Sequence, residues 1–120
     1  GDVCQSMTVA GSKAYIVVNN SQKVIVVNTS SFVKQQEITG FTSPRYFLPV
    51  SNSKAYVTDL FANVISIVNL SSNTISGSIS LNGWSEELVL AYGKAYITNK
   101  NSNKVYVINT LNDVIIDSII

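Results

Sequence analysis

The sequence contains no histidine and only one cysteine, Cys4, in its 120 residues. The absence of histidine excludes Ser-His-Asp catalysis, Cys-His catalysis and histidine-containing zinc sites within this chain. A single cysteine cannot form an intramolecular disulfide, and we expect Cys4 to be a free thiol without a special role. Cysteine usage therefore does not indicate a redox compartment.

Charge is also scarce, since charged residues make up 12% of the chain and the formal net charge is +1. A domain that binds nucleic acid normally carries far more positive charge, so nucleic acid is not expected as a partner. Hydrophobic residues make up 46%, which excludes a disordered acidic tail. Apolar runs such as 24–27 are much too short to cross a bilayer, so no transmembrane segment is expected.

The abundant residues are strand formers and turn formers. Valine and isoleucine dominate the hydrophobic residues, whereas serine, asparagine and threonine are frequent in the short segments between them. Side chains branched at Cβ favour strands, and asparagine and serine favour tight turns. The composition therefore predicts an all-β fold.

A four-residue motif occurs three times, at intervals of about 40 residues. Its copies are Lys13-Ala14-Tyr15-Ile16, Lys54-Ala55-Tyr56-Val57 and Lys94-Ala95-Tyr96-Ile97. Each copy precedes a β-branched run that ends in asparagine, at Asn28, Asn69 and Asn109. Internal repeats of this length are typical of propellers and solenoids.

Each period contains four short strand-like runs separated by turn residues. In the middle unit these runs are 45–50, 55–59, 64–69 and 74–79. Four antiparallel strands in a period of about 40 to 45 residues form the pattern of a β-propeller blade. The sequence predicts a single propeller segment over residues 1–120, with three four-stranded antiparallel blades at about 5–38, 44–79 and 86–119.

The repeats resemble the YVTN-type, YncE-like bacterial β-propellers, which include surface-layer-like repeat proteins. The resemblance lies in 14–19, 55–59 and 95–99, each followed by an apolar strand that ends in Asn-Thr or Asn-Leu. Residues 42–45 also resemble that family's approach to the innermost strand. The resemblance implies an exported protein, periplasmic or at the cell surface, and some members of that family bind ligands on one face of the ring.

Three blades are fewer than the roughly four to eight of a closed propeller. An open arc exposes apolar blade flanks, and such surfaces associate with other protein surfaces. We therefore expect self-association as a homodimer that completes a six-bladed ring, or further blades supplied by a longer chain.

The loops on one predicted face differ between the units. Phe61 lies in a turn that is polar in the other two units, and the connections between blades carry Phe41 and Trp84. Together with Arg45 and Glu86 near the channel mouth, these residues are predicted to bind a small ligand or a surface partner. The alternative is that the aromatic side chains are buried between blades and stabilise the core.

The tyrosines and lysines of the repeated motif are interpreted without a binding role. Recurrence at one blade position indicates that the tyrosines fill the same gap between blades, and the lysines are too few for a nucleic-acid surface. These residues are Tyr15, Tyr56 and Tyr96, and Lys13, Lys54 and Lys94 on the face opposite the aromatic loops.

A binding module without enzymatic activity, cofactor or metal is therefore the expected function. One alternative is a propeller-type enzyme, such as a lyase or lactonase, with a site in the channel. However, Glu86 and Glu87 are adjacent and point to opposite faces of a strand, and Asp59 alone makes a poor metal site. The other alternative is a purely structural repeat segment of a larger surface protein.

Overall fold

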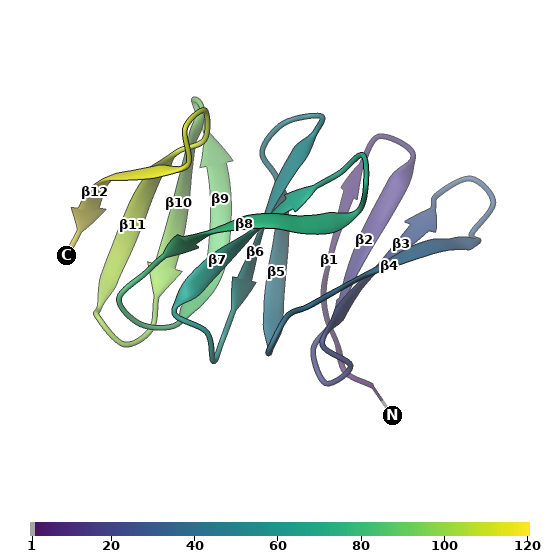
Figure 1. Cartoon of the computed structure of the whole chain (residues 1–120), viewed down its shortest axis with the longest axis horizontal. Coiled ribbons are helices and arrows are strands. Elements are labelled where there is room, and N and C mark those ends of the chain that lie inside the picture. Colours follow the sequence, from purple (N-terminus) through teal and green to yellow (C-terminus); the bar gives the residue numbers. More distant parts are fainter. Residues whose placement is uncertain (1) are drawn as a thin grey trace.

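The computed structural model describes residues 2–120, which form twelve strands in three separate four-stranded antiparallel sheets (Figure 1). The strands are β1 (Cys4–Ala10), β2 (Lys13–Val18), β3 (Lys23–Asn28), β4 (Lys34–Thr39), β5 (Pro44–Pro49), β6 (Lys54–Asp59), β7 (Val64–Asn69), β8 (Thr74–Ser80), β9 (Ser85–Ala91), β10 (Lys94–Asn99), β11 (Lys104–Asn109) and β12 (Val114–Ile119). Strands that follow one another in the chain pair within each sheet, as they do in a propeller blade. The prediction of an all-β fold made of propeller blades is confirmed.

The three sheets are blade 1 (β1–β4), blade 2 (β5–β8) and blade 3 (β9–β12). They span residues 4–39, 44–80 and 85–119, and the ranges expected from the sequence lie within these spans. Figure 1 shows the blades side by side, with blade 2 in the middle and the innermost strands β1, β5 and β9 adjacent to one another. No helix among residues 2–120 is long and apolar enough to cross a membrane.

Each turn between the third and fourth strand of a blade is built in the same way. The asparagine that ends the third strand accepts backbone N–H groups of the turn: Asn28 Oδ1 accepts from Ser30 and Ser31, and Asn69 Oδ1 accepts from Ser71 and Ser72. Asn109 Oδ1 accepts from Leu111 N in blade 3. The repeated asparagines therefore form Asx turns, in which a short polar side chain satisfies the backbone donors of the turn.

The hydrophobic core lies between the blades, in two layers. Between blades 1 and 2 it contains Tyr15, Val17, Val24, Val26, Ile38, Phe41, Phe47, Ala55, Val57 and Val68. Between blades 2 and 3 it contains Tyr56, Ile65, Ile79, Leu81, Leu88, Ala95, Ile97 and Ile108. Blade 2 is thus covered on both faces, which explains why β6 is buried at every position from Ala55 to Asp59.

The repeated tyrosines pack between blades where a following blade is present. The Tyr15 ring stacks on Phe47 with centroids 4.3 Å apart and an interplanar angle of 11°. Tyr56 is fully buried, and its hydroxyl donates to Asp113 Oδ1 in blade 3. Tyr96 occupies the same position on the outward face of blade 3 and is only half-buried. The structural interpretation of Tyr15 and Tyr56 is confirmed.

Candidate functional site

The loops divide between two faces of the molecule. Turns between second and third strands, together with the connections 40–43 and 81–84 between blades, form the aromatic face along the lower edge in Figure 1. Turns between first and second strands and between third and fourth strands form the opposite face, along the upper edge. The aromatic face holds the residues expected from the sequence to bind a ligand or partner.

Phe61 and Trp84 form an aromatic pair on this face. Phe61 lies in the turn between β6 and β7, and Trp84 directly precedes β9, so the pair joins blades 2 and 3. Their ring centroids are 5.2 Å apart with an interplanar angle of 83°, the edge-to-face geometry that aromatic rings favour. Phe61 is 59% exposed and Trp84 is half-buried. The pair therefore presents an aromatic surface to solvent.

Phe41 does not belong to this surface, which corrects the expectation for that residue. Its side chain is only 6% exposed and packs in the core between blades 1 and 2. Gly40 precedes it with a φ of 105°, a conformation open to glycine but rarely adopted by other residues, and β5 begins at Pro44 soon afterwards. For Phe41, the alternative interpretation as an aromatic residue buried between blades is correct.

Arg45 and Glu86 are joined to each other and to blade 1. Arg45 Nε donates to Glu86 Oε2 at 3.0 Å, and Arg45 Nη1 donates to Gln5 Oε1 at 2.8 Å. The three residues lie near the starts of β9, β5 and β1, so one hydrogen-bonded chain crosses the innermost strands of all three blades. Both charges are partly exposed and already paired, which makes this chain a fixed polar wall beside the aromatic face.

Asp59 stabilises the connection between blades 1 and 2. The carboxylate is 1% exposed, and it accepts the backbone N–H of Thr42 at 2.7 Å and of Ser43 at 2.8 Å. Hydrogen bonds to backbone N–H groups satisfy a buried carboxylate. Among the residues that the structure describes, no three His, Cys, Asp or Glu side chains are grouped to hold a metal ion. Through its bonds to Thr42 and Ser43, the Asp59 carboxylate holds the connection between blades 1 and 2 in place.

Asn99 has the corresponding position in blade 3 and makes a different set of contacts. Its Oδ1 accepts Ser102 N at 3.0 Å and Ser102 Oγ at 2.7 Å, whereas its buried Nδ2 has no hydrogen-bond partner among residues 2–120. A Cβ on Gly83 would lie 2.8 Å from Asn99 Oδ1. Because Gly83 lacks that atom, the connection that carries Trp84 packs directly against Asn99.

Each outer blade leaves one core-type face uncovered within the described chain. Met7 in blade 1 has the strand position that the buried Phe47 has in blade 2, and it is 65% exposed. Tyr96 and Val105 in blade 3 have the positions of the buried Tyr15 and Val24 in blade 1. The two uncovered faces, called here the open faces, therefore carry the two complementary halves of an interface between blades.

The family and the fold relatives agree with this architecture. Residues 1–120 match the family model described as Domain of unknown function (DUF5074). The chain belongs to this family. No curated protein matches the sequence significantly. The YVTN-type resemblance stays a prediction, since neither the family description nor the names of the structural neighbours include it.

Solved structures show the same fold at low sequence identity. Hydrazine synthase from Kuenenia stuttgartiensis superposes with a TM-score of 0.88 at 17% identity, over 96% of this chain and 35% of that one. Apo AztD from Citrobacter koseri superposes with a TM-score of 0.77 at 18% identity, over 97% of this chain and 34% of that one. Dihydro-heme d1 dehydrogenase NirN in complex with DHE superposes with a TM-score of 0.75 at 7% identity, over 95% of this chain and 27% of that one.

These neighbours are β-propeller proteins, and the chain spans about a third of their length or less. At such identities the likeness shows the fold alone. The chain is thus a β-propeller module of three blades.

Proposed function

We propose that this propeller module binds a small ligand or a surface partner through the aromatic face, with Phe61 and Trp84 as the contact residues. The edge-to-face pair carries the proposal, since the mostly exposed Phe61 ring beside the half-buried Trp84 presents an aromatic surface of the kind that is typical of binding sites. Arg45 and Glu86 supply the polar rim beside it.

The proposed role is binding without catalysis. Glu86 is paired with Arg45, and Glu87, on the adjacent residue of β9, is exposed. The two carboxylates therefore do not converge on one point, as general acid/base chemistry requires. An enzyme with a channel site needs groups from other blades. Location outside the cytoplasm is proposed from the YVTN-type resemblance alone.

A fluorescence titration tests the proposal, because Trp84 is the single tryptophan of the chain. A panel of soluble oligosaccharides and short peptides is titrated while Trp84 emission is recorded. We expect at least one member to change the emission saturably, Phe61→Ala to abolish that change, and Phe32→Ala to retain it. Phe32 is the matched control because it is an equally large, exposed side chain on the opposite face.

Thermal unfolding of the same variants separates binding from packing. Because Phe61 is mostly exposed, Phe61→Ala is expected to cost less than about 1 kcal/mol, far below the roughly 3–5 kcal/mol of a buried phenylalanine. A large loss of stability favours the purely structural repeat segment, and a panel without any saturable response counts against ligand binding at this face.

We also propose that the open faces take blades of the same kind, either from a second copy that completes a ring or from a longer chain. The equivalence of Met7 with Phe47, and of Tyr96 with Tyr15, supports this pairing. Light scattering of the isolated chain distinguishes the two sources: a mass near twice 13.0 kDa indicates a second copy, and a monomer indicates further blades. If the chain is a dimer, Met7→Lys is expected to convert it into a monomer.

A further inference from the structure

A pocket that the sequence did not predict lies on the face opposite the aromatic pair, where blades 1 and 2 meet. Its volume is about 480 Å³, within the range of small-molecule sites. Lys13, Tyr15, Pro49, Ser51, Asn52 and Leu70 are among the residues that line it. The pocket therefore combines one cation, hydroxyl and amide groups, and an apolar wall.

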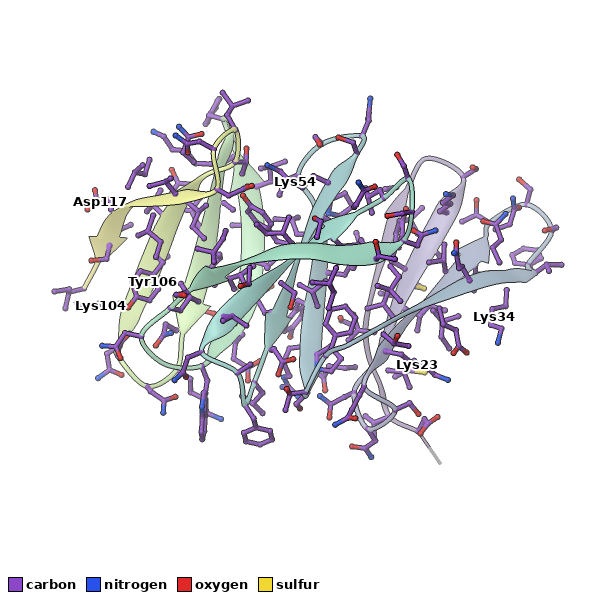
Figure 2. The ribbon with its side chains drawn as sticks, viewed as in Figure 1. Lys23, Lys34, Lys54, Lys104, Tyr106 and Asp117 are labelled. Carbon is purple, nitrogen blue, oxygen red and sulfur yellow. The ribbon has the colours of Figure 1, made fainter. Side chains whose placement is uncertain are left out.

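Between blades 2 and 3 the equivalent lysine and tyrosine hold a carboxylate of the protein itself. Lys54 Nζ donates to Asp113 Oδ1 at 2.7 Å and to the Thr110 carbonyl at 2.6 Å, and the Tyr56 hydroxyl donates to the same Asp113 oxygen. Figure 2 shows Lys54 at the upper edge, where blades 2 and 3 adjoin. A lysine and a tyrosine of one blade thus hold a carboxylate from the next blade.

Blades 1 and 2 carry the same lysine and tyrosine without that carboxylate. Lys13 and Tyr15 have the motif positions of Lys54 and Tyr56, whereas Asn73 has the turn position of Asp113. The backbone of the turn is alike at both places, with φ of 53° at Asn73 and 59° at Asp113. Asn73 carries no charge, and its Nδ2 donates to Gln36 Oε1 on β4.

Lys13 and Tyr15 consequently keep their donors available to the pocket. Within residues 2–120 neither side chain takes part in a side-chain hydrogen bond or an ion pair of the kind that Lys54 and Tyr56 make. Lys13 is half-buried and the Tyr15 side chain is buried against Phe47, and both residues line the pocket.

We propose that this pocket binds the carboxylate of a small organic acid, which contacts Lys13 and Tyr15 as Asp113 contacts Lys54 and Tyr56 between blades 2 and 3. Lys13 donates to the carboxylate as Lys54 does, and Tyr15 donates its hydroxyl as Tyr56 does. The apolar part of the acid packs against Pro49, Leu70 and Leu90, while Ser51 and Asn52 contact its polar substituents.

The chemistry of the two donors fits an anion with an apolar body. A charge-assisted hydrogen bond from an ammonium group is roughly twice as strong as a neutral one, and partial burial strengthens it further. A tyrosine hydroxyl keeps its proton at neutral pH and is a donor there, and burial raises the pKa of Tyr15 further. Inorganic phosphate carries at least as much negative charge as a carboxylate but leaves the apolar wall uncovered, which makes it the weaker ligand.

The test is an amide-resolved NMR titration of the whole chain with benzoate. We expect saturable shifts at Gly11, Ser12, Ser51 and Asn52, which lie in the turns that line the pocket. Benzyl alcohol, which lacks the carboxylate, and inorganic phosphate, which lacks the apolar body, are each expected to bind about tenfold more weakly.

Substitutions then identify the side chains that donate hydrogen bonds to benzoate. Lys13→Met is expected to remove benzoate binding, whereas the matched control Lys94→Met retains it, because Lys94 has the same motif position on an exposed face away from the pocket. Tyr15→Phe is expected to weaken binding several-fold. Asn73→Asp places a carboxylate at the Asp113 position, so it is expected to raise the melting temperature and to abolish benzoate binding.

Several results overturn the proposal. Equal shifts from benzoate and from benzyl alcohol show that binding depends on apolar contact alone and not on the carboxylate. Unchanged benzoate binding in Lys13→Met or in Asn73→Asp contradicts the assignment of the donors. The absence of saturable shifts in the wild-type chain contradicts the existence of the site. If Lys13→Met does not fold, Asn73→Asp still tests the proposal, because Asn73→Asp is expected to stabilise the chain.

Discussion

The Arg45 guanidinium and the Glu86 carboxylate connect the innermost strands of blades 2 and 3, with 3.0 Å between Nε and Oε2. Gln5 extends this contact to blade 1, where its Oε1 accepts from Arg45 Nη1. One hydrogen-bonded chain therefore fixes the spacing of three neighbouring strands that share no backbone pairing.

Glu86→Gln is expected to lower the free energy of unfolding by no more than about 1 kcal/mol, because a partly exposed ion pair contributes little in water. The difference from wild type should shrink as salt is added. Urea unfolding at low and high salt measures both effects. Glu87→Gln is the control, since Glu87 is exposed and forms no ion pair with the described residues. A salt-independent loss of several kcal/mol contradicts this estimate.

Asp59→Ala is expected to cost roughly 2–4 kcal/mol, because it leaves the buried backbone N–H of Ser43 and the partly buried N–H of Thr42 without their acceptor. Asp59→Asn retains one acceptor oxygen and is expected to cost less. Chemical denaturation gives the two values. Equal stability of wild type and Asp59→Ala shows that the connection relaxes and finds other acceptors.

Gly83→Ala is expected to destabilise the chain by roughly 1–3 kcal/mol. The added Cβ meets Asn99 Oδ1 at 2.8 Å, and the φ of 107° at Gly83 is unfavourable for any other residue. Gly11→Ala is the matched control, because Gly11 has a φ of 58° but no atom near its Cβ position. If melting temperatures of the two variants are equal, backbone strain rather than the contact with Asn99 determines the loss.

Stability is expected to fall in alkaline solution through Tyr56. Burial is the main cause that raises the pKa of Tyr56, and the hydrogen bond to Asp113 and its negative charge raise it further. As the pH rises above about 10, the unfolded chain loses the tyrosine proton first, so the folded state binds more protons and the free energy of unfolding decreases. This contribution is fully present below that pH.

Tyr56→Phe is therefore expected to unfold with a shallower pH dependence above about 10. Near neutral pH the same variant loses one hydrogen bond to Asp113 and is expected to be less stable by about 1 kcal/mol. Urea unfolding from neutral to alkaline pH gives both quantities. Tyr15→Phe is the comparison, since burial alone raises the pKa of Tyr15. Parallel pH curves for wild type and Tyr56→Phe contradict the assignment.

Much of the fold could be predicted because it depends on local sequence patterns. The Lys-Ala-Tyr motif marks the second strand of every blade, and Asn28, Asn69 and Asn109 mark the following turns through bonds to residues two or three positions later. Such patterns depend on nearby residues only. For the aromatic residues of the candidate site, the predicted placement on one face holds for Phe61, which is exposed, and for its half-buried neighbour Trp84, whereas Phe41 is buried; their role in binding stays a prediction.

The sequence by itself determined the number of blades, their strands and their turns, because these follow from short-range periodicity and turn chemistry. Only the tertiary structure decided what each repeated side chain meets. Lys13, Lys54 and Lys94 are identical in the motif, yet one lines a pocket, one binds Asp113 and one is exposed. The difference arises because Lys54 meets Asp113 of the next blade, 59 positions later in the chain, whereas the turn position of Asp113 holds Asn73 in the blade that follows Lys13, and the described residues form no blade after that of Lys94.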